Sequence, residues 1–421
     1  CIPARAAIAT GRYPSQCGAP TFITYLPPSE VTFATLLQRA GYHTAMIGKL
    51  HFGPTDVARG HDEEEINDLH GPHGRIAGAT DASPSYLRFL RDAGFAEASE
   101  LTRREGRFAA RWLADVKYHL DHFIGDRGVA WLTDHRPTDK PWYLCLSFPG
   151  PHMPYDGLGT PQADLYDPSE IDLPRTRRAD LADKPPHFAG QYETGHGSPG
   201  INPQTPPSER ELRELRLSYY ANVTLIDEQI GRVVAALKAA GQYDDTLIIF
   251  TSDHGDFMGD YGLVGKGQYL SEVLMRIPLL VKPPVAGFAV AGRAEAAFVN
   301  AVDIAPTCLA AAGAEIPPNM PADDLTAFWA DPAGATRRED AYTEAAGLRG
   351  LRTDRWKLVH YLHRPYGELY DLAADPWERV NLWDDPSAAG ARAELTRRLA
   401  DRMIELGARS EVPWNRGAPE I

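Results

Sequence analysis

Three short apolar runs, each followed at once by a polar or turn-forming segment, constrain the fold of this chain most. They cover residues 44–48, 143–148 and 246–251. Compact apolar runs of this length are typical of strands that are covered on both faces, as in parallel sheets flanked by helices. Ligands of such sheets bind at the carboxyl ends of the strands. The polar residues that follow the three runs are therefore candidates for a functional site.

Helical patterns alternate with these strands. A helix is expected over residues 31–40, and a capping box formed by Ser208 and Glu211 opens a longer one that Gly241 is placed to end. This alternation predicts an α/β fold: a large, mixed, mostly parallel central sheet with helices on both faces.

After about residue 335 the pattern changes to short strands, and a helix follows at 388–406. We therefore expect an α/β domain over residues 1–335 and a small α+β subdomain over 336–421. The expected short strands of the second unit cover residues 349–352, 356–361 and 368–371.

The charge balance restricts the class of partner. The 421 residues include 43 Lys+Arg and 57 Asp+Glu, which gives a formal net charge of −14. This balance argues against a nucleic-acid partner, because phosphate backbones attract clustered basic residues. It leaves room for a small anionic substrate in a locally basic pocket. No run of about 18 apolar residues occurs, so no membrane span is expected. The cysteines form no Cys-x-x-Cys pair, which argues against a disulfide framework; they are Cys1, Cys17, Cys145 and Cys308.

Two long segments are predicted to be loops. Residues 54–80 include the acidic run 62–65 and the pair His70 and His73, and residues 183–207 are rich in Pro, Gly and polar residues. The Gly-Pro between the two histidines prevents a helix from aiming both imidazoles at one metal, which favours a solvated loop over a ligand pair. Both loops are expected to shape the wall of a substrate pocket.

Cys1 is predicted to lie at the start of a helix. Pro3 has the backbone angle suited to a first helical turn, and Ala-rich sequence follows. The free N–H groups and the dipole at such an end stabilise an anion. Arg5, about one turn further, can point to the same place. Taken alone, the pattern fits an ordinary helix start with a small buried cysteine equally well.

The motif Cys1-x-Pro3-x-Arg5, followed by Thr10-Gly11-Arg12, resembles the signature of type I sulfatases in the alkaline-phosphatase superfamily. Further segments resemble the later motifs of this family, in the same order. These segments cover residues 41–51, 151–155, 251–267, 303–307 and 367–382. The resemblance therefore spans nearly the whole chain.

The resemblance implies a modified nucleophile and a metal. In type I sulfatases the motif cysteine, here Cys1, is oxidised to formylglycine by a dedicated machinery, and its hydrate is the nucleophile. Asp253 and His254 then become metal ligands together with modified Cys1. The ion is expected to be Ca²⁺, with Mn²⁺ or Mg²⁺ as alternatives. The family carries two further acidic ligands on a strand upstream of the motif cysteine, so such a strand is expected to precede Cys1. Asp256 and Asp260 are expected to support the surrounding structure.

The resemblance also implies roles for the other polar residues. One hydroxyl of the hydrate attacks sulfur, and three cations neutralise charge on the transferring group: Arg5, Lys49 and Lys266. His152, with Lys266, is expected to bind sulfate and to help protonate the leaving alcohol. His51 then takes the proton of the second hydroxyl, which expels the sulfate. Without the resemblance, the two lysines would be read as surface groups and the two histidines as core residues.

The sequence therefore predicts hydrolysis of a sulfate monoester, with a small molecule or a saccharide as the alcohol. One alternative is a phosphonate monoester hydrolase or phosphodiesterase of the same superfamily, because residue types alone do not separate these tetrahedral groups. Another is a non-catalytic relative that binds an anion, which the full set of catalytic residue types argues against. Ala4 replaces the usual Ser of the first motif, a variant that the modifying machinery is expected to accept. Cytoplasmic and exported locations and any oligomeric state remain open.

Overall fold

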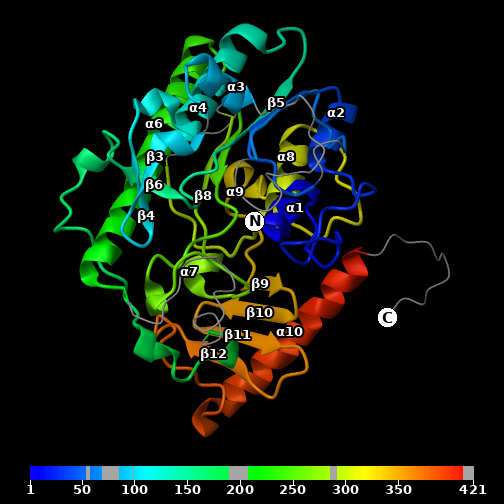
Figure 1. Ribbon diagram of the computed structural model, residues 1–421. Helices are drawn as coiled ribbons and strands as arrows, with labels where there is room; N and C mark the ends of the chain where they lie inside the picture. The colour runs from blue at the N-terminus through cyan, green and yellow to red at the C-terminus, as the bar shows by residue number, and fades with distance from the viewer. Residues whose placement is uncertain (54–56, 69–84, 97, 189–206, 285–291, 411–421) are drawn as a thin grey trace.

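The computed structural model describes residues 1–421 except 54–56, 69–84, 97, 189–206, 285–291 and 411–421 (Figure 1). Its main helices are α1 (Ile2–Thr10), α2 (Phe33–Arg39), α3 (Ser85–Asp92), α4 (Leu120–Ala130), α6 (Glu209–Ala239), α7 (Glu272–Met275), α8 (Ile304–Ala311), α9 (Ala327–Ala330) and α10 (Ala389–Ser410). The N-terminus lies near the centre of the picture beside α1, and a small sheet with α10 forms the lower part.

A parallel sheet with helices on both faces confirms the expected α/β class. Strand β1 (His43–Gly48) lies between β2 (Glu63–Ile66) and β5 (Trp142–Ser147), and both pairings are parallel. Ala45 and Ile47 of β1 share an apolar cluster with Phe123 of α4. Met46, which points to the opposite face, shares another cluster with Ala6 of α1. The apolar run of β1 is thus covered from both sides.

The remaining described strands form separate ladders. Strand β7 (Ile248–Thr251) pairs antiparallel with β8 (Leu279–Lys282). Strand β4 (Ala109–Trp112) lies between β3 (Thr102–Glu105) and β6 (Tyr155–Leu158). The candidate residues that follow strands come after strands of the parallel sheet and of the β7–β8 ladder.

The acidic run was expected in a loop, and the structure corrects this: residues 63–66 form β2. Its acidic side chains are partnered, so the strand tolerates them. Glu63 accepts a hydrogen bond from Trp131 Nε1 at 3.0 Å, and Glu65 accepts one from Arg127 Nε at 2.7 Å. His70, His73 and most of the loop at 183–207 lie outside the described residues.

The capping box of the long helix is confirmed. The Ser208 hydroxyl accepts from Glu211 N, the Glu211 carboxylate accepts from Ser208 N, and α6 continues to Ala239. Gly241 follows with a φ of 64°, as expected for a residue that ends a helix.

The C-terminal subdomain is an antiparallel sheet with α10 packed against it. Its order is β12-β11-β10-β9, with β9 (Asp340–Ala345), β10 (Leu348–Thr353), β11 (Trp356–Tyr361) and β12 (Gly367–Asp371). Strand β9 was not expected, because little of its sequence is strongly apolar. One apolar cluster joins this sheet to the main body, and it includes Leu37 of α2, Leu309 of α8, Leu351 of β10 and Leu395 of α10. Among the described residues, no helix has the length and apolar character needed to cross a membrane.

Candidate active site

Three strand ends and one helix start meet at the candidate site. Lys49 and His51 follow β1, His152 follows β5, and Asp253 and His254 follow β7. Helix α1 begins directly after Cys1, which is its N-cap, as expected.

Gly48 lets the ends of β1 and β5 approach closely. Its φ is 107°, and a Cβ at this position would lie 2.1 Å from the carbonyl oxygen of Ser147. Any other residue would force the two strand ends apart. The glycine therefore brings the segment after β1 next to the segment after β5.

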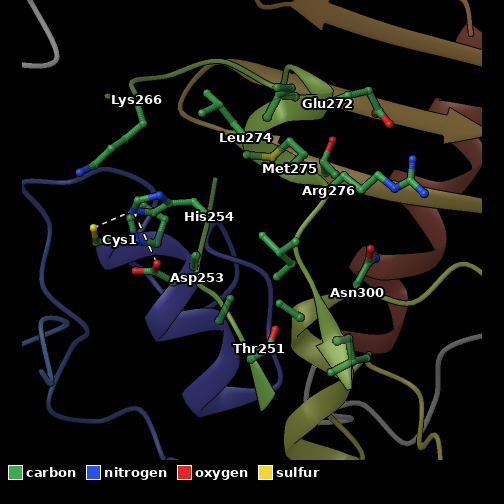
Figure 2. A pocket seen from close by; sticks show the side chains of 18 of the residues that line it. Cys1, Thr251, Asp253, His254, Lys266, Glu272, Leu274, Met275, Arg276 and Asn300 are labelled. Atoms are coloured by element: carbon green, nitrogen blue, oxygen red, sulfur yellow. Dashed lines mark hydrogen bonds and ion pairs between the residues drawn. The ribbon is translucent and has the colours of Figure 1, made fainter. Parts of the chain in front are cut away.

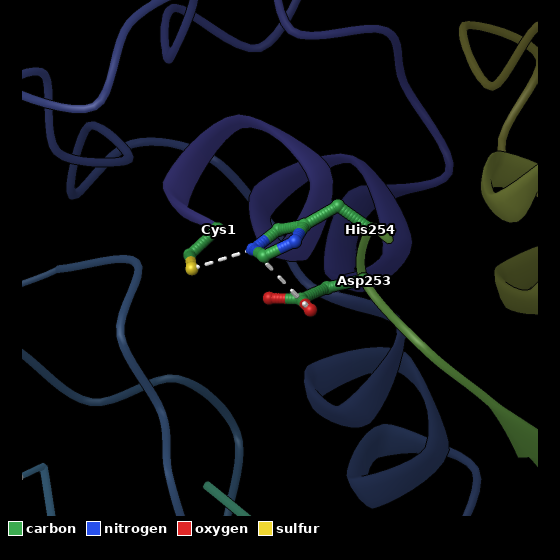
Figure 3. Close-up of side chains that lie close together, drawn as sticks. All are labelled: Cys1, Asp253 and His254. Atoms are coloured by element: carbon green, nitrogen blue, oxygen red, sulfur yellow. Dashed lines mark hydrogen bonds and ion pairs between the residues drawn. The ribbon is translucent and has the colours of Figure 1, made fainter. Parts of the chain in front are cut away.

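Cys1 lies among groups that can bind a metal or an anion. Its Sγ is 2.8 Å from Nε2 of His254 (Figure 3). The same atom is 3.7 Å from Nζ of Lys49. Cys1, Asp253 and His254 each offer one ligand atom, and these atoms all lie within 4.8 Å of one another. The structure thus brings together the metal-ligating residues expected from the sequence.

The protonation states of these groups suit a divalent cation. His254 Nδ1 donates to the Gly255 carbonyl at 2.8 Å, which turns Nε2 toward Cys1. Burial lowers the pKa of His254 to about 4, so the ring is neutral near pH 7. Burial alone would raise the pKa of Asp253, but His254, Arg5 and Lys49 hold it well below its usual range. Oδ2 of Asp253 is buried and accepts no hydrogen bond. A buried carboxylate oxygen, an imidazole nitrogen and an oxygen on modified Cys1 fit such an ion.

Arg5 connects α1 to the ends of β1 and β5. Its Nε donates to the Leu50 carbonyl at 2.9 Å, and its Nη2 contacts the Lys49 carbonyl and the Ser147 hydroxyl. Nη1 lies 3.6 Å from Oδ2 of Asp253. These contacts hold together the segments after β1 and β5. The sequence motif did not indicate this structural role of Arg5.

His152 and Lys266 form a pair on the other side of the site. The Lys266 ammonium contacts Nε2 of His152, while Nδ1 of His152 donates to the Met153 carbonyl at 2.8 Å. The ring centroids of His152 and His254 are 6.3 Å apart. Burial, only partly opposed by Asp256, lowers the pKa of Lys266 to about 8.

The other two candidate residues also have pKa values lowered by their surroundings. Burial lowers the pKa of Lys49. Burial and the neighbouring Lys49 lower the pKa of His51 to about 3. The His51 imidazole is therefore neutral near pH 7.

Asp256 and Asp260 serve the structure around the site. Asp256 accepts from the Tyr155 hydroxyl at 2.7 Å and from the Gly265 amide at 2.9 Å, which joins the His152 segment to the Lys266 segment. Asp260 accepts from the Thr176 hydroxyl at 2.8 Å. Three supporting residues were not singled out from the sequence: Asp68, Asp121 and Ser147.

Asp121 supports the turn before His152. It is 1 % exposed, and its Oδ1 accepts from the Gly150 amide at 3.1 Å. Burial raises the pKa of Asp121 to about 6.

Six of the eight candidate residues line one cavity of about 2640 Å³, and Arg5 and Lys49 are not part of its lining. Its lining includes Cys1, His51, His152, Asp253, His254 and Lys266. In Figure 2 the Lys266 side chain extends toward the side on which Cys1 and His254 lie. Arg104, Arg107 and Phe108, from β3 and the turn to β4, line another part of the same cavity.

Family models agree with this geometry. The sulfatase family model matches residues 1–314, and the model described as N-sulphoglucosamine sulphohydrolase, C-terminal, matches residues 259–405. The chain therefore belongs to the sulfatase family, within the alkaline-phosphatase superfamily.

Individual relatives span nearly the whole chain. It is 30 % identical to the choline-sulfatase of Rhizobium meliloti, over 94 % of this chain and 75 % of the relative. It is 26 % identical to the N-acetylglucosamine-6-O-sulfatase of Bacteroides thetaiotaomicron, over 95 % of this chain and 77 % of that protein. A solved structure of a phosphonate monoester hydrolase from Silicibacter pomeroyi has the same fold, with a TM-score of 0.80 and 24 % identity over 98 % of this chain and 86 % of that one.

Proposed function

We propose that this protein hydrolyses a sulfate monoester and that Cys1, converted to formylglycine, carries the nucleophile. The observation that supports this most is the position of Cys1. Its Sγ lies at the start of α1, within 2.8 Å of His254 Nε2 and 3.7 Å of Lys49 Nζ. The sulfur marks the place that the hydroxyls of a hydrated aldehyde would take. One hydroxyl would attack sulfur, and deprotonation of the other would expel the sulfate and restore the aldehyde.

Asp253, His254 and modified Cys1 would hold a divalent cation, with Ca²⁺ as our first choice. Such an ion lowers the pKa of a hydroxyl that it contacts and offsets negative charge on the sulfate.

The residues of the chain itself would bind the sulfate and move the protons. Lys49 and Lys266 supply positive charge for the sulfate oxygens. The contact between the Lys266 ammonium and His152 Nε2 supports a role for this pair in protonating the leaving alcohol. His51 is neutral and would take the proton from residue 1.

We propose a small molecule or a saccharide as the alcohol part of the substrate. Two relatives are a choline-sulfatase and an N-acetylglucosamine-6-O-sulfatase, which represent both kinds. Arg104, Arg107 and Phe108 also line the cavity and are candidate contacts for this part. We place these functions in residues 1–335 and a supporting role in residues 336–421.

A paired assay tests the reaction. An aryl sulfate and an aryl phosphonate monoester are supplied to the metal-loaded protein, and a peptide mass spectrum reports whether residue 1 is an aldehyde. We expect sulfate turnover to dominate and Cys1→Ala to lower kcat/KM by at least about 10³-fold, because the nucleophile is removed.

The two arms separate the alternatives. Phosphonate turnover that exceeds sulfate turnover by orders of magnitude would make the protein a phosphonate hydrolase, like the structural relative. Unchanged turnover in Cys1→Ala would remove residue 1 from the mechanism. Sulfate binding without turnover of either ester by the aldehyde form would indicate a non-catalytic relative.

A further inference from the structure

The backbone between Lys49 and His51 takes a conformation that needs support. His51 has a φ of 53°, in the left-handed region that residues other than glycine rarely adopt. Such conformations persist where surrounding contacts hold them, and they occur often at functional sites. His51 is also the residue whose imidazole we expect to take a proton from residue 1.

Asp68 supplies this support from one side. Its Oδ1 accepts from the Leu50 amide at 2.7 Å, and its Oδ2 accepts from the His51 amide at 2.8 Å. Asp68 reaches these amides because it continues β2 beyond Ile66, which pairs with Gly48 at the end of β1. Burial raises the pKa of Asp68, so the carboxylate is held in a poorly hydrated place where amide donors stabilise it.

Arg5 holds the same segment from the other side. Its guanidinium contacts the carbonyls of Lys49 and Leu50, whereas Asp68 takes the amides of Leu50 and His51. The segment is therefore fixed by two charged side chains of opposite sign. This arrangement leaves little freedom for the backbone that carries the His51 ring.

We propose that Asp68 is a positioning residue for His51: it fixes the backbone turn that directs the imidazole into the cavity lined by Cys1. The proposal rests on the proposed function, because it gives Asp68 a part in the reaction through His51. Two other effects of Asp68 must be separated from it. One is its negative charge, which acts on Lys49, and the other is general stabilisation of the β1–β2 pair.

Asp68→Asn tests the proposal, because the amide keeps the shape but points an N–H group at a backbone N–H. We expect kcat to fall about 10- to 100-fold with KM changed less than about threefold, since a displaced catalytic group slows the chemical step. The same substitution in a His51→Ala background should change kcat less than about twofold, because the residue through which Asp68 acts is gone.

Asp62→Asn is the matched control. Asp62 also accepts from a β1 amide, that of Thr44 at 2.9 Å, but at the opposite end of the strand from the site. We expect this variant to keep wild-type kcat. An equal loss in both aspartate variants, or an undiminished Asp68 effect in the His51→Ala background, would overturn the proposal.

Amide hydrogen exchange tests the contacts of Asp68 with the Leu50 and His51 amides without an activity assay. Asp68→Asn should speed exchange at Leu50 and His51 by at least about tenfold, whereas Asp62→Asn should not. Unchanged exchange at these two amides would overturn the proposal. If the wild-type protein turned over neither ester while exchange responded as expected, the proposed function would fail and the hold of Asp68 on His51 would stand.

Discussion

Two groups of charged residues in this protein differ in how far nearby carboxylates compensate for the burial of their lysines. Where the C-terminal sheet meets α7, Lys357 Nζ lies 2.6 Å from Glu378 and 3.3 Å from Glu272, and Arg352 lies 3.6 Å from Glu272. This C-terminal charge cluster has two cations and two anions. The candidate site holds Arg5, Lys49 and Lys266 beside Asp253, and the carboxylates of Asp68, Asp121 and Asp256 also act on its two lysines.

The pKa shifts follow this difference. Burial alone would lower the pKa of Lys357, but Glu378 and Glu272 more than compensate and raise it. The pKa of Lys266 is lowered to about 8, because burial is not matched by enough negative charge. Nearby carboxylates therefore keep Lys357 charged in the folded protein, whereas at the site burial outweighs the carboxylates that act on Lys266.

The largest expected effect on stability comes from breaking the balanced cluster. Glu378→Gln leaves Lys357 buried with one partner fewer, so we expect the free energy of unfolding to fall by about 3–5 kcal/mol. Urea unfolding measures this free energy. Glu394→Gln, a substitution at an exposed position, is the control and should shift the midpoint little. An unchanged midpoint in Glu378→Gln would show that the cluster does not stabilise the fold.

Removing a lysine from the candidate site should lower activity without lowering stability. Lys266→Ala is expected to lower kcat/KM about 10²- to 10³-fold, because positive charge near the transition state is lost. The urea midpoint should not fall, since the variant relieves repulsion and the cost of burial. Lys238→Ala, near the exposed end of α6, is the control for both readouts. A loss of stability as large as that of Glu378→Gln would remove the contrast between the two clusters.

The smallest effect concerns pH. Because the pKa of Lys266 is lowered to about 8, this lysine loses its proton as the pH rises through 8. We expect kcat/KM for the aryl sulfate to fall about tenfold per pH unit above that point, since kcat/KM reports groups of the free enzyme. Circular dichroism at each pH checks that the protein stays folded. A profile that is flat up to pH 10 would mean that the charge of Lys266 is not needed.

Much of the architecture could be predicted from the sequence because apolar patterning and caps are local. The apolar runs placed β1, β5 and β7. The polar residues after β1 and β5 meet at one edge, as the carboxyl ends of parallel strands do, and those after β7 lie beside them although β7 belongs to a separate ladder. Pro3 and the Ala-rich sequence placed the start of α1 at Cys1.

Strand β2 and the support of the site were not predictable in this way. An acidic run has the composition of a solvated loop, and only partners such as Trp131 and Arg127, distant in the sequence, allow it to form a strand. Asp68 and Arg5 hold backbone amides and carbonyls, which every residue type provides. The contacts of Asp68 and Arg5 with the backbone therefore cannot be recognised from residue types in the sequence.

The apolar cluster shared by α2, α8, β10 and α10 has a consequence for how the molecule unfolds. Side chains from both ends of the chain, such as Leu37 and Leu395, contribute to one core. Loss of the C-terminal sheet would expose the apolar sides of α2 and α8 to water, and α2 leads directly into β1. We therefore expect the C-terminal sheet to unfold together with α2 and α8, so that a substitution that destabilises the sheet also destabilises the helix that precedes β1.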